Sequence, residues 1–407
     1  MKFLYRIVIL AIVVLLCFYL VKYPITTKVE DILCNIEDPV RDQYAIQQGI
    51  ARFYLSEERQ LVYDAMYLAI SEGSERVTLP VDGYIDNDVE VVLISILNDC
   101  PQFFYVDYSD CSYAIDDRGL TILISYLYSG AELERMQKEL NSRIKSLVDA
   151  TVVLGLSSEY QKAVYLHDAI AEMCEYDKSL NGKNIHNAYG ALVSQLAVCD
   201  GYAHAYQLVL EELGIECHYV TGEARGPHGA EGHAWNIVKL DGVYTTIDLT
   251  WNDIDSYMFE EFIAPSKDIT SHIYFGISED EMKQTHRIDE KYIYPLPIAE
   301  DRNWFSYYGL VGLSIEEISD RASDMLLENI GRTVPYVEIR LLDHETFFDF
   351  LEVYSGEIIE RANEKLEMLG VEYRVKNEMN CFVTSLDKGC ILVVVELEEI
   401  EIDVDVI

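Results

Sequence analysis

The chain has 407 residues and a formal net charge of −40, because 71 acidic side chains outnumber 31 basic ones. This charge argues against nucleic-acid binding, which needs a basic surface to contact phosphates. The length exceeds one ordinary domain, so we expect two or three folded units.

An apolar run near the N-terminus, Ile7–Val21, follows Lys2 and Arg6. With its apolar neighbours the run approaches the roughly 20 residues that a membrane-spanning helix needs. No small-residue cleavage site follows it. We therefore predict a single-pass anchor in the cell membrane over residues 1–23, with the folded part outside. A secreted product of a cleaved signal peptide is the alternative. Residues 24–40 are expected to form a stalk.

Residues 41–150 are predicted to form a small α/β domain that ends in a linking helix. The spacing of apolar residues along the chain supports these assignments. The predicted helices are Glu57–Ser71, Asp88–Asn98 and 131–150, and the predicted strands lie near Gln102–Tyr108, Tyr113–Ile115 and Leu120–Tyr128. No candidate catalytic group stands out in this region, and its tyrosines are expected to pack inside.

The region after residue 150 is predicted to hold helices at about 158–175 and 186–194, followed by a helix that begins near Cys199. After Cys199, apolar side chains recur at helical spacing until Gly214. A cysteine attacks carbonyl carbon as the thiolate, and the N-terminus of a helix stabilises negative charge. Cys199 is therefore the candidate nucleophile.

A predicted hairpin supplies an imidazole and a carboxylate. His233 opens a β-prone apolar run, and Asp241-Gly242 is a hairpin turn into a second strand that ends near Asp248. Pairing across this turn places His233 formally opposite Thr250, with Asp248 diagonal to it on the same face. Asp248 can then accept from one ring nitrogen while the other nitrogen faces the thiol.

The motifs around these residues resemble the transglutaminase-like superfamily. They are Cys199-Asp200-Gly201-Tyr202, His233-Ala234-Trp235-Asn236 and Asp248-Leu249-Thr250-Trp251, preceded by Tyr176-Asp177 and His186–Leu192. The resemblance covers roughly residues 155–275. It implies an α+β, papain-like or transglutaminase-like core, in which the nucleophile helix packs on an antiparallel sheet, with Cys199, His233 and Asp248 as catalytic residues.

The residue after the nucleophile narrows this resemblance. Calcium-dependent animal transglutaminases have a tryptophan next to the nucleophile, and here that position is Asp200. The chain is therefore similar to the bacterial branch, for which peptidase or amidase activity is implied as readily as crosslinking.

Four further residues are predicted to belong to the oxyanion site or the pocket: Gln195, Tyr202, Trp235 and Asn236. The backbone N–H of Cys199 is the natural first oxyanion donor, and the side chain of Gln195 is a candidate second donor. The other three are expected to shape the pocket or to orient His233.

Other polar groups near the site receive weaker assignments. The glycine-rich segment Gly222–Gly232 is predicted as a flexible lid or, alternatively, a plain strand connection. Cys217 and His218 have no second Cys or His pair at metal-binding spacing, so we expect no metal and no cofactor. The remaining histidines considered are expected at the surface or in support of the site: His167, His186, His204 and His228.

The nine cysteines leave two disulfides open as candidates. Cys100 with Cys111, and Cys381 with Cys390, are separated by turn-like segments and could cross-link hairpins outside the cell. Scattered buried thiols are the alternative.

The C-terminal third is predicted to be a second flanking domain. The catalytic domain is assigned to residues 151–275, with a strand at Tyr257–Ala264, and residues 276–300 are assigned to a linker. Residues 301–407 are predicted to form an α+β domain, with helices near 314–328 and 344–368 and strands near 335–341, 371–375 and 391–397.

The expected function is a cell-surface cysteine acyl-transfer enzyme that acts on amide bonds of protein or peptide substrates. The reaction would pass through a thioester and end in hydrolysis or transamidation. The alternative is a surface binding or assembly module in which catalysis is dispensable, because the flanking domains make up most of the chain.

Overall fold

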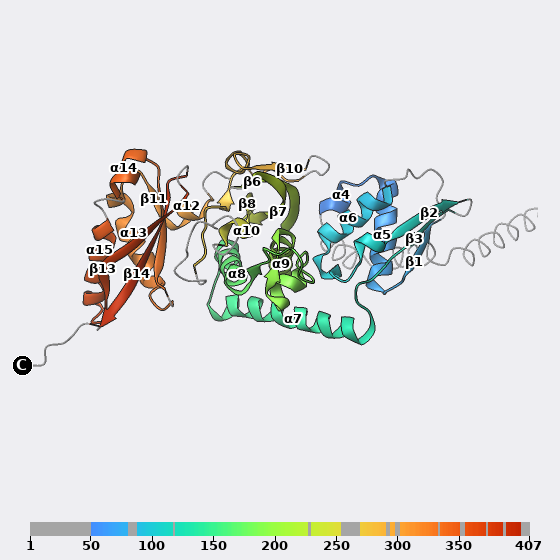
Figure 1. Ribbon diagram of the computed structural model, residues 1–407, viewed down its shortest axis with the longest axis horizontal. Coiled ribbons are helices and arrows are strands. Elements are labelled where there is room, and N and C mark those ends of the chain that lie inside the picture. Colours follow the sequence, from blue (N-terminus) through green and yellow to red (C-terminus); the bar gives the residue numbers. More distant parts are fainter. Residues whose placement is uncertain are drawn as a thin grey trace, which may run out of the picture.

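The computed structural model describes residues 50–79, 88–116, 119–226, 229–253, 269–289, 294–297, 302–332, 334–350, 355–371, 373–385 and 388–399. The predicted anchor and stalk, the strand predicted at Tyr257–Ala264 and His228 lie outside these residues. None of the helices within the described residues has the length and apolarity that a bilayer crossing requires. Three units follow one another along the long axis of the molecule (Figure 1).

The N-terminal unit packs helices on a three-stranded antiparallel sheet of order β1-β3-β2. Its elements are α4 (Ile50–Phe53), α5 (Glu57–Ser71), β1 (Arg76–Leu79), α6 (Asp88–Asp99), β2 (Ser112–Asp116) and β3 (Gly119–Leu123). The predicted strand at Gln102–Tyr108 is wrong, because this segment contains two 3-10 turns, Pro101–Phe103 and Tyr108–Asp110. Four consecutive side chains from Phe103 to Val106 are buried, which a strand with one solvent-facing side cannot achieve.

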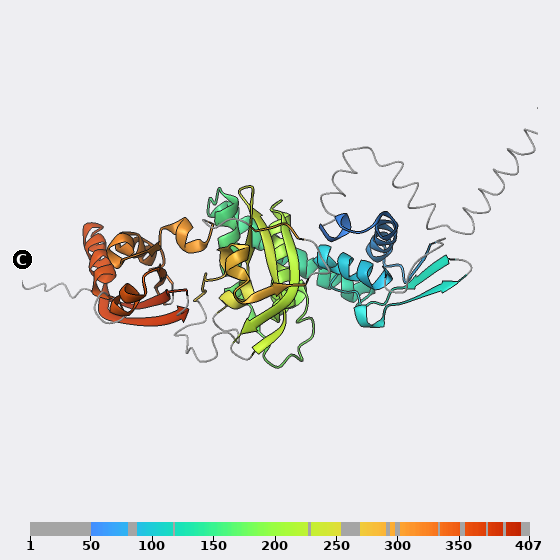
Figure 2. The ribbon, with the colours of Figure 1, turned by 90° about the horizontal axis from the view of Figure 1, so that it is seen from above.

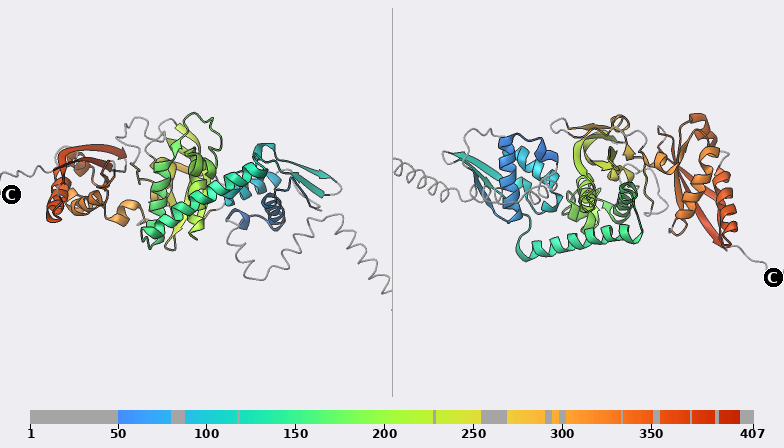
Figure 3. Two further views of the ribbon diagram at one scale, coloured as in Figure 1. Left: turned by 90° about the horizontal axis from the view of Figure 1, so that it is seen from below. Right: turned by 180° about the vertical axis from the view of Figure 1, so that it is seen from behind.

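The linking helix α7 (Gly130–Val153) runs along one side of the N-terminal and central units (Figure 3). Its buried side chains recur every three to four residues and form one stripe: Met136, Leu140, Ile144, Leu147 and Thr151. Such a stripe lets a helix pack on neighbours along its whole length. The predicted helix at 131–150 is confirmed.

The central unit packs α8 (Glu159–Met173) and α9 (Cys199–Glu212) against a five-stranded antiparallel sheet of order β10-β6-β7-β8-β9. The strands are β6 (Cys217–Gly226), β7 (Gly229–Leu240), β8 (Val243–Ile247), β9 (Phe275–Ile277) and β10 (His286–Ile288). Figure 2 shows the long strands of this sheet side by side. The expected fold class, a nucleophile helix on an antiparallel sheet, is confirmed.

The β7–β8 hairpin turns at Asp241-Gly242 as predicted, with Leu240 opposite Val243 and Asn236 opposite Ile247. The ladder does not continue to His233, because Asp248 leaves the strand and caps the short helix α10 (Leu249–Asn252). His233 instead lies opposite Gly222 on β6.

The prediction of a loop over Gly222–Gly232 is wrong, because β6 and β7 pair from Cys217 opposite Val238 to Gly226 opposite Gly229. Gly222 is explained by packing. A Cβ atom at this position would collide with the carbonyl oxygen of Arg287 and with the ring of Trp235. Glycine here therefore marks a close approach of strands.

The sheet also extends beyond the predicted catalytic domain. β9 and β10 reach residue 288, inside the segment assigned to a linker. Each of these strands has three residues, too few to show a period in the sequence. The helix predicted at 186–194 is also shorter in the structure, which has a π-helical turn at Gly190–Ser194.

The C-terminal unit has a four-stranded sheet of order β11-β12-β14-β13 with helices packed on it. The short helix α11 (Glu279–Met282) lies before it in the chain, between β9 and β10. The elements of the C-terminal unit are α12 (Trp304–Tyr308), β11 (Val311–Gly312), α13 (Ile315–Glu328), β12 (Tyr336–Leu341), α14 (His344–Asp349), α15 (Ser355–Met368), β13 (Tyr373–Ser385) and β14 (Cys390–Glu399). The predicted α+β composition is confirmed. Within the helix predicted at 344–368 the structure describes α14 and α15, and residues 351–354 lie outside the described residues.

The two candidate disulfides do not form, since all seven cysteines in the described residues are free. Cys381 lies opposite Val393, and Cys390 lies opposite Ser385, so the strand register separates the two thiols. Cys100 is fully buried beside the hydroxyl of Tyr63, whereas the half-buried thiol of Cys111 donates to the carbonyl oxygen of Asp107.

A substitution at Gly201 tests how closely the first turn of α9 packs against its neighbours. A Cβ atom there would lie 2.5 Å from the carbonyl oxygen of Ile185 and 2.7 Å from Cβ of Ala197. We expect Gly201→Ala to lower the free energy of unfolding by about 1–3 kcal/mol, measured in urea, because the added methyl group overpacks this contact.

Gly356 is the matched control, because it lies in α15 and a Cβ atom there meets nothing within 4 Å. Alanine in place of glycine normally stabilises a helix by up to about 1 kcal/mol. Equal stability changes in Gly201→Ala and Gly356→Ala would contradict the packing argument.

Candidate active site

Cys199 is the first residue of α9, so its thiol lies at the positive end of the helix dipole. The side chain is half-buried against Ala203, Tyr219 and Ala234. The close contact of Gly201 with residues 185 and 197 sets the position of this first helical turn. The thiol is therefore held at the start of the helix, in a residue that is only partly buried.

His233 and Asp248 form a buried pair in which Nε2 of the ring lies 2.8 Å from Oδ2 of the carboxylate. Burial opposes charge on both groups, but the attraction and the hydrogen bond between them outweigh it. The pKa of His233 is therefore above its ordinary value, and the pKa of Asp248 is below its ordinary value. The pair is therefore an imidazolium and a carboxylate at neutral pH.

The thiol of Cys199 also hydrogen-bonds the His233 ring and helps to raise its pKa. Nε2 of the ring is occupied by Asp248, so Nδ1 is the nitrogen that faces the sulfur. The structure thus brings together the thiol, imidazole and carboxylate that the sequence singled out.

Asp248 is held by the backbone as well as by the imidazole. As the N-cap of α10 its Oδ1 accepts from the N–H of Trp251 at 3.1 Å, and its own N–H donates to the carbonyl oxygen of Tyr274 at 3.0 Å. A second ring, that of His286 on β10, lies with Nε2 3.0 Å from Oδ2. Sequence reasoning missed His286, because no motif or period marks the short strand that carries it.

Asp200, the residue after the nucleophile, forms its own network at the edge of the site. Its Oδ2 lies 2.7 Å from Nδ1 of His186, and its Oδ1 accepts from the hydroxyl of Tyr219 at 2.9 Å. The same Oδ1 is 4.0 Å from Sγ of Cys199. The hydrogen bond to Asp200 raises the pKa of His186, so this histidine can balance the negative charge beside the thiol.

Two of the four residues predicted for the oxyanion site or the pocket connect elements of the core. The Tyr202 hydroxyl donates to Oδ2 of Asp253 at 2.6 Å and lies 3.1 Å from the carbonyl oxygen of Cys174. Asn236 donates from Nδ2 to the carbonyl oxygen of Ala203 at 3.1 Å. Both side chains are fully buried, so Tyr202 does not face an open pocket, and Asn236 fixes β7 on α9.

The other two of these four residues, Trp235 and Gln195, lie in different surroundings. Trp235 is buried. Its ring centroid lies 6.1 Å from that of His233, in a stacked arrangement, and 5.0 Å from that of His286, which it meets edge-on. These contacts fit the expected role in orienting His233. Gln195 is exposed and has a left-handed backbone with φ of 58°. Its role as an oxyanion donor stays a prediction.

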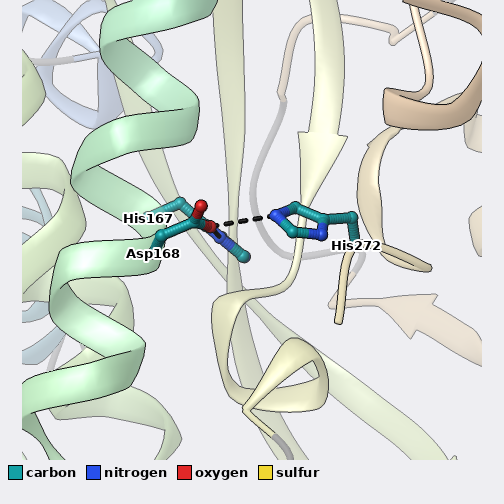
Figure 4. A group of neighbouring side chains, drawn as sticks. All are labelled: His167, Asp168 and His272. Atoms are coloured by element: carbon teal, nitrogen blue, oxygen red, sulfur yellow. Dashed lines mark hydrogen bonds and ion pairs between the residues drawn. The ribbon is translucent and has the colours of Figure 1, made fainter. Parts of the chain in front are cut away.

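A second buried polar cluster lies between α8 and the segment before β9 (Figure 4). Oδ1 of Asp168 is 2.9 Å from Nδ1 of His167 and 2.9 Å from Nε2 of His272. Asn252, at the end of α10, reaches the same cluster through Nδ2, which is 3.0 Å from Nε2 of His167. The cluster therefore packs directly behind the helix that Asp248 caps.

The backbone settles the protonation of His167. Oδ1 of Asn252 accepts from the N–H of Tyr274 at 2.9 Å, so Nδ2 must be the amide atom that faces His167 and donates to its Nε2. The proton of a neutral ring then lies on Nδ1 and is donated to Asp168. Burial lowers the pKa of His167, which agrees with the neutral form.

His272 joins the cluster to the C-terminal unit. Its Nδ1 lies 3.6 Å from Oε2 of Glu338 on β12, and its backbone N–H donates to the same oxygen at 2.8 Å. Glu338 is fully buried and also accepts from Ser271 and Thr384. Burial alone would lower the pKa of His272. The charge of Asp168 and the contact with Glu338 outweigh burial and raise this pKa to about 9. A cation between two carboxylates therefore stabilises this junction.

In two clusters of three side chains, the atoms that could bind a metal ion lie within 4.8 Å of one another. The clusters are His167, Asp168 and His272, and His233, Asp248 and His286. In each group both rings hydrogen-bond the carboxylate, and the Nδ1 proton of His167 occupies the lone pair that an ion would need. The donors therefore suit hydrogen bonding, and the expectation of no metal stays a prediction.

The central unit resembles known proteins over part of its length. Residues 147–251 match the family model described as the transglutaminase-like superfamily. The kyphoscoliosis peptidases of Mus musculus and Homo sapiens are each 30% identical over 93 residues, which is 20% of this chain and 14% of the relative. The chain thus matches a small part of these curated relatives.

A solved structure described as a TGase aligns with 47% of this chain and 52% of its own, at 16% identity and a TM-score of 0.25.

Removing Glu338 tests the junction. We expect Glu338→Ala to lower the free energy of unfolding by about 3 kcal/mol in urea at pH 7, because the buried His272 cation loses a partner. Glu328→Ala is the control, since Glu328 is exposed and pairs with Arg321 on the surface, and its loss should cost less than about 1 kcal/mol. Equal effects would contradict a buried ion pair at the junction.

The pH dependence of stability tests the charge of His272. Its pKa in the folded chain, about 9, exceeds the ordinary 6.5. The stabilisation is therefore complete below about pH 6.5 and is lost as the pH rises through about 9. Unfolding in urea at pH 6 to 10 should show this loss for the native chain and a smaller loss for His272→Gln. Parallel curves would mean that His272 is neutral in the folded state.

Proposed function

We propose, from the transglutaminase-like domain that residues 147–251 form, that this chain is a cysteine acyl-transfer enzyme acting on amide bonds of proteins or peptides. The observation that carries the proposal is the buried imidazole of His233, which lies between Asp248 and the thiol of Cys199. This order of groups is the arrangement used for nucleophilic acyl transfer.

The first half of the reaction forms a thioester. The Cys199 thiolate attacks the carbonyl carbon of the amide, and the backbone N–H at the start of α9 is the nearest natural donor to the developing oxyanion. The C–N bond then breaks, and the His233 imidazolium gives its proton to the leaving amine. Asp248 stays ionised and keeps the ring aligned.

The second half releases the acyl group. His233, now neutral, takes a proton from the acceptor as that acceptor attacks the thioester carbonyl, and Cys199 leaves as the thiolate. Water as acceptor completes hydrolysis, and an amine completes transamidation. We favour hydrolysis, because the mouse and human relatives are named as peptidases.

The cell-surface location belongs to the same proposal and rests on the apolar run at residues 7–21 alone. The seven free thiols of the described residues require no oxidising compartment for folding.

Alkylation of Cys199 in the full chain tests the proposed pair. We expect iodoacetamide to label Cys199 faster than the buried thiols of the described residues, because the His233 imidazolium lies beside its sulfur. His233→Ala should slow the labelling by about 100-fold, since it removes the imidazolium that stabilises the thiolate beside it. Peptide mass spectrometry gives the rate for each cysteine separately.

Cys381 is the internal control, because burial raises its pKa to about 11 and it lies far from the site on β13. Its rate should not change in His233→Ala. Incubation with p-nitrophenyl acetate should leave an acetyl thioester on Cys199 in the native chain. Slow labelling of Cys199 in both chains, with no thioester, would refute the proposed function.

The alternative, a binding module, has one structural feature in its favour. A cavity of about 110 Å³ lies between the N-terminal unit and the central one and is lined by residues of both, among them Asp99, Gln207 and Tyr219. Full biological activity of a Cys199→Ala variant would favour this second function.

A further inference from the structure

Asp248 interacts with one more imidazole than the proposed reaction uses. Its Oδ2 lies 2.8 Å from Nε2 of His233 and 3.0 Å from Nε2 of His286. Its Oδ1 accepts from the N–H of Trp251. His233 comes from β7 and His286 from β10, two strands separated by β6 in the sheet.

The hydrogen bonds of His286 indicate which nitrogen carries its proton. An ionised Asp248 can only accept, so Nε2 of His286 must donate to it. Nδ1 lies 2.8 Å from the hydroxyl oxygen of Thr285. Burial lowers the pKa of His286 despite the carboxylate, so the ring is neutral and Nδ1 accepts from that hydroxyl. His286 is therefore a neutral donor in one tautomer.

Aromatic packing holds the ring in this orientation. The His286 ring centroid lies 4.3 Å from that of Trp251, 5.0 Å from that of Trp235 and 5.7 Å from that of Tyr274. The backbone of His286 pairs with Ala224 on β6. The charged or titratable groups that act on the ring are Asp248, His233 and Lys388. Rotation of the imidazole away from Asp248 would disrupt these ring contacts, while the backbone pairing fixes where the side chain starts.

We propose that His286 is a positioning residue, which donates a second hydrogen bond to Oδ2 of Asp248 and so fixes the carboxylate that aligns His233. The inference rests on the proposed function of Cys199 and His233.

The geometry explains what this hydrogen bond adds. Trp251 holds Oδ1 and His286 holds Oδ2, and neither group exchanges a proton with substrate. The plane of the carboxylate is thus set independently of His233, which must gain and lose a proton in each turnover. Each added donor also stabilises the anion, so Asp248 does not take the proton that His233 must deliver.

Two substitutions separate the hydrogen bond from the packing. His286→Phe keeps an aromatic ring among Trp235, Trp251 and Tyr274 but removes the donor. His286→Gln keeps an amide donor near the position of Nε2 but removes the ring. His218→Gln is the matched control, because His218 is a buried histidine on the neighbouring strand β6 that pairs with Glu216 outside the site.

The readout is the pH profile of Cys199 alkylation by iodoacetamide in the full chain, with thermal unfolding recorded for each variant. We expect His286→Phe to slow labelling at pH 7 by about tenfold, the effect of losing about 1.4 kcal/mol. The pH of half-maximal labelling should also rise, because a loosened Asp248 stabilises the imidazolium less. His286→Gln should recover most of the rate, and His218→Gln should match the native chain.

Each outcome decides a different point. Equal losses in His286→Phe and His286→Gln would show that only packing matters, and no loss in His286→Phe would show no role; either overturns the inference. If His233→Ala also labels at the native rate, the proposed function falls and this inference falls with it. A slow His233→Ala beside a native-like His286→Phe refutes the positioning role alone.

Discussion

Asp248 is a carboxylate with no exposed surface that faces donors from three parts of the central unit. A buried charge of this kind is stable only when its lone pairs are satisfied. That requirement connects β7, α10 and β10 through one side chain. It also explains why the second strand of the hairpin ends at Ile247, because the residue that follows must turn inward to accept these hydrogen bonds.

The nucleophile is held to the same sheet by uncharged contacts. Asn236 on β7 donates to the backbone of Ala203 on α9, and Gly201 lets the first turn of that helix approach residues 185 and 197 closely. Gly222 likewise allows a close approach on β6, because the absence of a side chain leaves room for the backbone of β10 and the ring of Trp235. Small residues and one amide therefore set the distance between the thiol and the imidazole.

The second buried cluster extends this frame to the C-terminal unit. A continuous series of contacts runs from Asn252 through His167, Asp168 and His272 to Glu338. Asn252 closes the helix that Asp248 begins. The C-terminal sheet is thus connected, through His272, Asp168 and His167, to the helix that the candidate catalytic carboxylate caps.

The sequence by itself determined the local parts of this protein: the helix after Cys199, the Asp241-Gly242 hairpin and the order of thiol, imidazole and carboxylate. Helical spacing, a two-residue turn and short motifs are local signals, so they can be read without knowing the fold. Tertiary structure alone decided the rest. His286 and His272 lie on or near short segments without periodicity, and Tyr202 faces the interior because of how α9 packs. Their neighbours are far away in the chain, and a buried charge selects its partners only after the strands have come together.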